Sequence, residues 1–138
     1  MLPMTTDSRA RPFPTAAGPR GLRLGLDMVS VEDVQASIDE FGQRFVSRLF
    51  SAAEQADAVA VPARQAERLA ARFAAKEAAI KAFDLSAAGV SWRELEVRCD
   101  GQGVRLHLHG RAAVLAGVRE AALSFSHRRG HAVAIVLA

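Results

Sequence analysis

The chain has 138 residues, half of them hydrophobic, which is enough for one hydrophobic core and short for two ordinary domains. Its formal net charge is +3, and most of this charge comes from the three arginines and one aspartate of the first 20 residues. The remainder is nearly neutral, with no Tyr and one Trp, and therefore lacks the basic stripe and stacking aromatics of a nucleic-acid-binding protein. We expect no nucleic-acid partner.

The sequence shows no segment that would direct it to a membrane or to an oxidising compartment. No apolar run approaches the roughly 20 residues of a membrane span, and the N-terminus lacks the apolar stretch of a secretory signal. Cys99 is the only cysteine, which excludes an intrachain disulfide and a zinc site built from several thiolates. We therefore expect a cytoplasmic protein without membrane contact.

In chain order, residues 1–20 hold four of the five prolines and show no hydrophobic periodicity. Such a segment cannot bury a face of its own, so we expect a disordered extension ahead of a domain over residues 21–138. Hydrophobic side chains then occupy alternate positions from Leu22 to Met28. This period predicts a strand over residues 21–31 that is buried on at least one face.

An amphipathic helix is predicted next. Ser30 followed by Asp33 resembles a helix N-cap, and hydrophobic residues recur at spacings of three and four from Val34 to Leu49. We expect Gly42 to bend or split this helix.

The capping signature repeats at Ser51 and Glu54, which predicts a short helix that Pro62 must end. A long, Ala-rich helix is expected from Ala63 to Phe83.

The last third of the chain reads mostly as strands. Asp100-Gly101 is a strong turn signal between two of them, and a short helix is expected over residues 111–118. The strands are predicted over residues 92–99, 104–108, 122–127 and 131–137. The order of elements indicates an α+β fold with an antiparallel sheet and a long helix.

Two carboxylates are out of place in these elements. Glu77 lies on the helix stripe that should face the core, where a carboxylate is costly unless it is paired or bound to a metal. Asp27 interrupts an otherwise aliphatic strand. Glu77 could simply pair with Lys81 on the helix surface, and Asp27 could cap the following turn. Alternatively, two carboxylates from a strand and a helix, with phosphate and water oxygens, are the ligands that Mg²⁺ requires.

Five sequence blocks occur in a fixed order: Leu24 to Asp27, Arg44-Phe45 with Phe50 to Glu54, Ala71 to Ala82, Ser91 to Val97, and Leu123 to His127. Together they resemble the successive blocks of the holo-acyl-carrier-protein synthases, which are small 4'-phosphopantetheinyl transferases. The resemblance covers residues 21–138. It implies a homotrimer with coenzyme A bound between subunits, and Mg²⁺-dependent transfer of 4'-phosphopantetheine from coenzyme A to a serine of an apo acyl or peptidyl carrier protein, with release of 3',5'-ADP.

The resemblance also implies roles for individual residues. Asp27 and Glu77 match the Mg²⁺ ligands of the family, Lys81 matches the lysine that neutralises the coenzyme A phosphates, and His127 matches the histidine of the last block. The serine proton must go to a base, and we expect Glu77 to take it in preference to His127. Two further phosphate contacts are expected at Lys76 and Arg72.

The helix that follows the first strand corresponds to the family's carrier-docking helix, so we expect Arg44 and Arg48 to contact the acidic carrier. They could equally be a solvated face. The chain departs from the family near the start of this helix, where Glu32 and Asp33 replace a basic residue. The carrier could therefore differ from that of primary fatty-acid synthesis and belong, for example, to polyketide synthesis.

Two other functions remain open from the sequence. A non-catalytic module could keep the fold and bind coenzyme A or a carrier without transfer, although such a module has no need of a metal pair. A small metal-dependent hydrolase acting on coenzyme A would differ only in that water, and not a serine, attacks.

Overall fold

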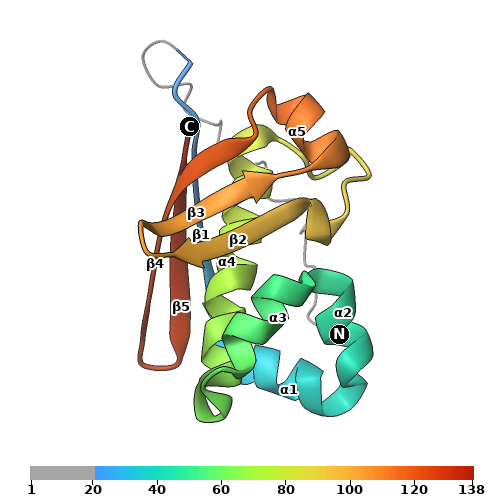
Figure 1. Cartoon of the computed structure of the whole chain (residues 1–138), viewed down its shortest axis with the longest axis vertical. Helices are drawn as coiled ribbons and strands as arrows, with labels where there is room; N and C mark the ends of the chain where they lie inside the picture. Colours follow the sequence, from blue (N-terminus) through green and yellow to red (C-terminus); the bar gives the residue numbers. More distant parts are fainter. Residues whose placement is uncertain (1–20) are drawn as a thin grey trace, which may run out of the picture.

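Five strands form one antiparallel sheet in the order β1-β5-β4-β3-β2 (Figure 1). The computed structural model describes residues 21–138, so the extension predicted over residues 1–20 lies outside the described residues. The strands are β1 (Leu24–Ser30), β2 (Leu95–Asp100), β3 (Gly103–Leu108), β4 (Glu120–Arg128) and β5 (His131–Leu137). Every neighbouring pair is antiparallel, which confirms the predicted α+β class.

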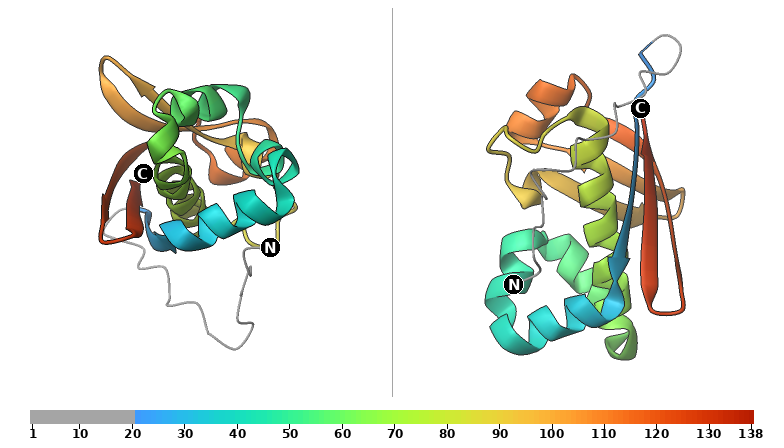
Figure 2. Two further views of the ribbon diagram at one scale, coloured as in Figure 1. Left: turned by 90° about the horizontal axis from the view of Figure 1, so that it is seen from below. Right: turned by 180° about the vertical axis from the view of Figure 1, so that it is seen from behind.

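One long helix, α4, packs along one face of this sheet, and α1 and α3 pack against α4 in turn (Figures 1 and 2). The helices are α1 (Val31–Phe41), α2 (Gln43–Leu49), α3 (Ala52–Val59), α4 (Gln65–Phe83) and α5 (Gly110–Ala116), with short 3₁₀ turns η1 (Pro62–Arg64) and η2 (Trp92–Glu94). None of these helices combines the length and hydrophobicity of a transmembrane span.

Local sequence signals account for the helix boundaries. Gly42 has φ +60° and separates α1 from α2, as predicted, because this left-handed conformation suits glycine. The strand predicted from Trp92 begins only at Leu95. A second capping box explains the difference: the Ser91 backbone N–H donates to Glu94, and the Ser91 hydroxyl accepts from the backbone of Arg93, which winds this segment into η2.

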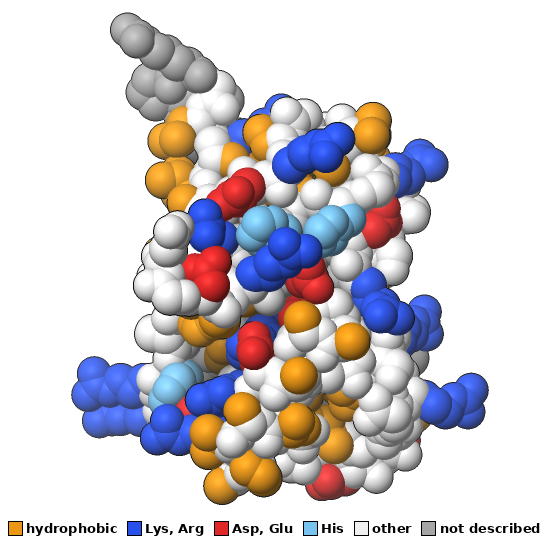
Figure 3. Space-filling model, viewed as in Figure 1, with side chains coloured by type: hydrophobic (Ala, Val, Ile, Leu, Met, Phe, Trp, Pro, Cys, Tyr) orange, Lys and Arg blue, Asp and Glu red, His pale blue; other side chains and the backbone are white. Residues whose placement is uncertain are grey.

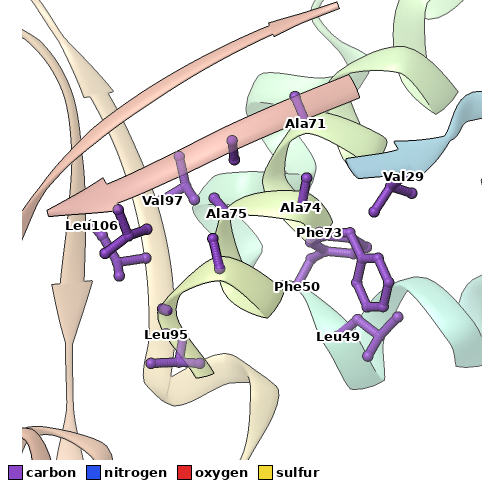
Figure 4. Packing of buried hydrophobic residues seen from close by; sticks show 14 of the residues in the cluster. Val29, Leu49, Phe50, Ala71, Phe73, Ala74, Ala75, Leu95, Val97 and Leu106 are labelled. Carbon is purple, nitrogen blue, oxygen red and sulfur yellow. The ribbon is translucent and has the colours of Figure 1, made fainter. Parts of the chain in front are cut away.

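The approach of β1 to α4 depends on small residues on both sides. A Cβ added at Gly25 would lie 1.8 Å from the carbonyl oxygen of Ala78, so no larger residue fits in β1 at this point. Buried alanines of α4, among them Ala74 and Ala75, lie among the larger side chains of the core (Figure 4). The close approach holds the next inward-facing residue of β1, Asp27, against α4.

A buried ion pair ties α4 to the rest of the core. The Lys76 ammonium donates to Glu54 Oε1 at 2.8 Å, and both side chains are fully buried. The same ammonium donates to the carbonyl oxygens of Trp92 and Leu95, while Glu54 Oε2 accepts from the backbone of Val97 at 3.1 Å. Burial lowers the pKa of Lys76, and Glu54 opposes this effect. The pair therefore joins α3, α4, η2 and β2 at one point.

We predict that Lys76→Met strongly destabilises the protein, because it leaves the Glu54 carboxylate buried without its cation. Loss of one partner of a buried pair costs about 3–5 kcal/mol of the free energy of unfolding, which urea unfolding would measure. The double variant Glu54→Gln with Lys76→Met should lose much less, because no charge remains in the core. Equal losses in the single and double variants would contradict this account.

Candidate active site

Asp27, Glu77 and Lys81 meet where the inner face of β1 crosses α4. Glu77 and Lys81 lie one helical turn apart on α4. The Lys81 ammonium donates to Asp27 Oδ1 at 2.7 Å and to the carbonyl oxygen of Leu26 at 3.3 Å. The Asp27 side chain is 17% exposed and that of Lys81 is 56% exposed, so the cluster has a buried carboxylate end and an open ammonium end.

The two carboxylates of this cluster repel each other. Burial raises the pKa of Glu77 from 4.5 to about 7; the negative charge of Asp27 adds to the rise, and Lys81 partly offsets it. The single positive charge of Lys81 therefore does not fully neutralise the carboxylates of Asp27 and Glu77. A further cation would bind favourably between these carboxylates.

The donor set fits Mg²⁺. Two carboxylate groups from a strand and a helix supply hard oxygen ligands, and among residues 21–138 no cluster of three or more His, Cys, Asp or Glu side chains is placed to hold a metal ion. Mg²⁺ commonly takes one or two protein carboxylates and completes its shell with phosphate and water oxygens. Asp27 and Glu77 match that pattern better than that of a zinc site.

A small recess of about 140 Å³ borders Glu77 on the side away from β1. Its walls come from the end of α4, the connection to η2, and η2 itself. They are largely apolar, and include Ile80, Leu85, Val90, Trp92 and Leu95, with Ser86 and Ser91 as hydroxyl groups. A ligand held at the carboxylates can extend an uncharged portion into this recess.

Within one chain, His127 does not join this cluster. It lies on the inner face of β4, where its Nε2 is 3.1 Å from Glu67 Oε1. Glu67 precedes Glu77 by ten residues on α4, which corresponds to about 15 Å along the helix axis. His127 can therefore reach an Asp27–Glu77–Lys81 cluster only from another copy of the chain.

The predicted phosphate contacts of Lys76 and Arg72 do not fit the structure. Lys76 is fully buried, and its ammonium is already bonded to one carboxylate and two carbonyl oxygens. Arg72 is 4% exposed; it donates to the carbonyl oxygen of Arg68 and lies 3.4 Å from Asp57. Both cations stabilise the core and are not available to a phosphate in solution.

The predicted docking residues do lie on the surface. Arg44 and Arg48 are exposed on α2, and neither forms an ion pair with the described residues. Glu32 and Asp33 are exposed in the first turn of α1, where negative charge favours the helix N-terminus.

The sequence did not reveal which face of β1 is buried. Gly25 and Val29 face α4, whereas Leu24, Leu26 and Met28 are exposed at 51%, 55% and 64%. Neighbouring positions of β5 extend this exposed surface, because the register pairs Leu24 with Leu137 and Leu26 with Ile135. We call this surface the outer sheet face; it consists of Leu24, Leu26, Met28, Val133, Ile135 and Leu137.

Residues 23–136 match the model of the 4'-phosphopantetheinyl transferase superfamily. The chain belongs to this superfamily. A relative from this superfamily is the holo-[acyl-carrier-protein] synthase of Koribacter versatilis, which is 44% identical over 125 residues that cover 84% of this chain and 96% of the relative.

Solved structures of phosphopantetheinyl transferases share the fold. The complex of the Chronobacterium ammoniagenes enzyme with coenzyme A has a TM-score of 0.73 and 32% identity, and covers 84% of this chain and 95% of the other. The Bacillus anthracis holo-(acyl-carrier-protein) synthase, in complex with CoA (3',5'-ADP), has a TM-score of 0.66 and 29% identity, and covers 83% and 93%.

The raised pKa of Glu77 generates a prediction about stability. Between pH 4.5 and about 7 the folded chain binds the Glu77 proton more tightly than the unfolded chain does, so stability falls as the pH rises through this range. We expect the free energy of unfolding of the metal-free wild type to decrease relative to that of Glu77→Gln between about pH 5 and about pH 8. Urea unfolding in a chelator would measure this, and a difference independent of pH would contradict it.

Proposed function

We propose that the chain transfers 4'-phosphopantetheine from coenzyme A to a serine of an apo carrier protein and releases 3',5'-ADP. The cluster of Asp27, Glu77 and Lys81 is the observation that carries this proposal, because it places two carboxylates and an accessible ammonium on rigid elements. Membership of the superfamily supports it, as does the name of the Koribacter relative.

Each residue of the cluster has a distinct role in this proposal. Lys81 binds phosphate oxygens of coenzyme A through its exposed ammonium. Asp27 and Glu77 would hold Mg²⁺, which when bound neutralises phosphate charge and orients the diphosphate. The hydrogen bond of Lys81 to the Leu26 carbonyl fixes the ammonium beside β1, so that it meets the substrate in a defined position.

The transfer exchanges a phosphoanhydride bond of coenzyme A for a phosphate ester bond to serine. The carrier's serine oxygen attacks the phosphorus that bears pantetheine, and the bond from this phosphorus to the bridging oxygen breaks. The electron pair of that bond leaves with 3',5'-ADP, and Lys81 offsets the negative charge that develops. We assign the proton of the serine hydroxyl to Glu77 as general base.

The outer sheet face is proposed to contact further copies of the chain in a closed homotrimer. An exposed apolar surface of this kind marks an interaction site, and it lies on the side of β1 opposite the cluster. In such an assembly His127 of one subunit would complete the site of another, since on its own chain it pairs with Glu67.

Carrier binding is assigned to the basic surface of α2. Arg44 and Arg48 present guanidinium groups without an ion-pair partner among residues 21–138, and an acidic partner would meet them through long-range attraction. The acidic first turn of α1 would repel the same partner, so we expect the carrier to contact mainly α2. The cytoplasmic location inferred from the sequence stays a prediction.

We predict that Asp27→Ala and Glu77→Ala each abolish transfer while the fold is kept. The assay incubates each variant with coenzyme A, Mg²⁺ and a panel of apo carrier proteins, and reads the mass gained by each carrier. Glu120→Ala, which removes an exposed carboxylate of β4, is the matched control and should stay active. Wild-type activity in either site variant at saturating Mg²⁺ would contradict the metal pair.

Chelation of the wild type should have the same effect, and Mg²⁺ or Mn²⁺, but no monovalent salt, should restore turnover. Measurements of coenzyme A binding and of 3',5'-ADP release separate the other functions. Coenzyme A binding without any transfer would indicate a non-catalytic module, and 3',5'-ADP release without a carrier would indicate a hydrolase.

Met28→Glu should dissociate the assembly, because it places a charge on the outer sheet face. Light scattering of the wild type at micromolar concentration should give a trimer, and a monomer mass would contradict the assembly.

Inactive Asp27→Ala and His127→Ala chains should regain part of the activity when they are mixed, because a mixed trimer contains sites with both residues intact. No recovery would show that His127 does not act across subunits.

A further inference from the structure

Most of the exposed surface of α3 and η1 is apolar. Every exposed residue between positions 52 and 63 is Ala, Val or Pro, and Val59 and Val61 are exposed at 50% and 38%. Of the two carboxylates of the segment, Glu54 is buried against Lys76, and Asp57, whose side chain is 42% exposed, is paired with Arg72. We call this surface the α3 patch; its exposed residues are Ala52, Ala53, Ala56, Val59, Ala60, Val61, Pro62 and Ala63.

Arginines border the α3 patch at both ends. Arg48 lies in the last turn of α2 ahead of it, and Arg64 ends η1 behind it; both are exposed and neither has an ion-pair partner among the described residues. Arg68 lies alongside and donates to the carbonyl oxygen of Asp57 at 2.7 Å. Figure 3 shows hydrophobic side chains gathered over α3, with Lys and Arg side chains to either side.

The α3 patch is separate from the surface proposed for subunit contact. α3 packs against α4 and β2, on the side of α4 away from β1 (Figure 2). A second copy seated on the outer sheet face would therefore leave the α3 patch accessible.

We propose that the α3 patch is a docking surface for an acidic, amphipathic helix of the carrier protein. The apolar side of that helix would cover Val59 and Val61, and its carboxylates would face Arg48 and Arg64. Alanines allow a helix to approach closely, and an apolar centre with a charged rim is the usual anatomy of a protein interface. This inference rests on the proposed function and extends the docking surface from α2 across α3 to η1.

The test compares steady-state transfer by three variants. Val59→Glu places a negative charge in the α3 patch, Arg64→Glu reverses its far rim, and Val114→Glu is the control, since Val114 is 80% exposed on α5. We expect Val59→Glu and Arg64→Glu each to raise KM for the carrier by about ten-fold, with kcat and KM for coenzyme A within about two-fold of wild type. Val114→Glu should match the wild type. All three positions are exposed, and a thermal melt checks the fold.

Two results would overturn the inference: an unchanged carrier KM in both patch variants, or an equal rise in the Val114→Glu control. The proposed function fails separately, if the wild type transfers nothing to any carrier. In that event, binding of a fluorescent apo carrier to the wild type and to Val59→Glu replaces the kinetic assay. Binding that Val59→Glu weakens would support the α3 patch, and equal or absent binding would reject it.

Discussion

The buried pair of Lys76 and Glu54 is the constraint on which the arrangement of the site depends. Consecutive residues of an α-helix point about 100° apart around its axis. Because Lys76 is bonded towards α3 and β2, its neighbour Glu77 turns towards β1 and Asp27. Packed hydrophobic residues could stabilise the core as well as this ion pair does. The contribution of the pair is that it allows only one rotation of α4 about its own axis.

Small residues supply the second constraint, the distance between β1 and α4. Gly25 touches the backbone of Ala78, and a strand held this close brings Asp27 within bonding distance of Lys81. The same closeness excludes water from part of Glu77 and so contributes to its raised pKa. The rotation of α4 and its distance from β1 together determine the chemistry of the site, which contains few residues.

Much of this structure could be predicted from the sequence, because many of the signals were local. The break at Gly42, the capping box of Ser51 and Glu54, and the order of helices and strands along the chain all follow from short patterns. The proximity of Asp27 and Glu77 was predicted from two carboxylates at positions that otherwise favour apolar residues. Charged residues at such positions carry information because burial of a charge costs free energy.

The wrong predictions concern the direction in which side chains point, because a pattern of residue types does not show whether a position faces the core. Because alanine fills most positions of α4, its apolar stripe did not show that Lys76 and Arg72 also face the core. The leucines of β1 alternate correctly for a strand, but alternation does not tell whether the chain itself or another molecule covers them. Their exposure at the outer sheet face appeared only with the full set of contacts.

The place of β1 at the edge of the sheet gives Asp27 a consequence beyond its proposed role in binding a metal ion. An edge strand offers unpaired backbone groups, and a long apolar edge invites uncontrolled pairing with other chains. From Leu24 to Ser30 the only charged side chain is that of Asp27, and it points inward. Inward-pointing charges are one of the means by which natural sheets discourage edge-to-edge aggregation. An inward-facing Asp27 therefore makes the pairing of another chain along β1 less favourable than an entirely apolar strand would.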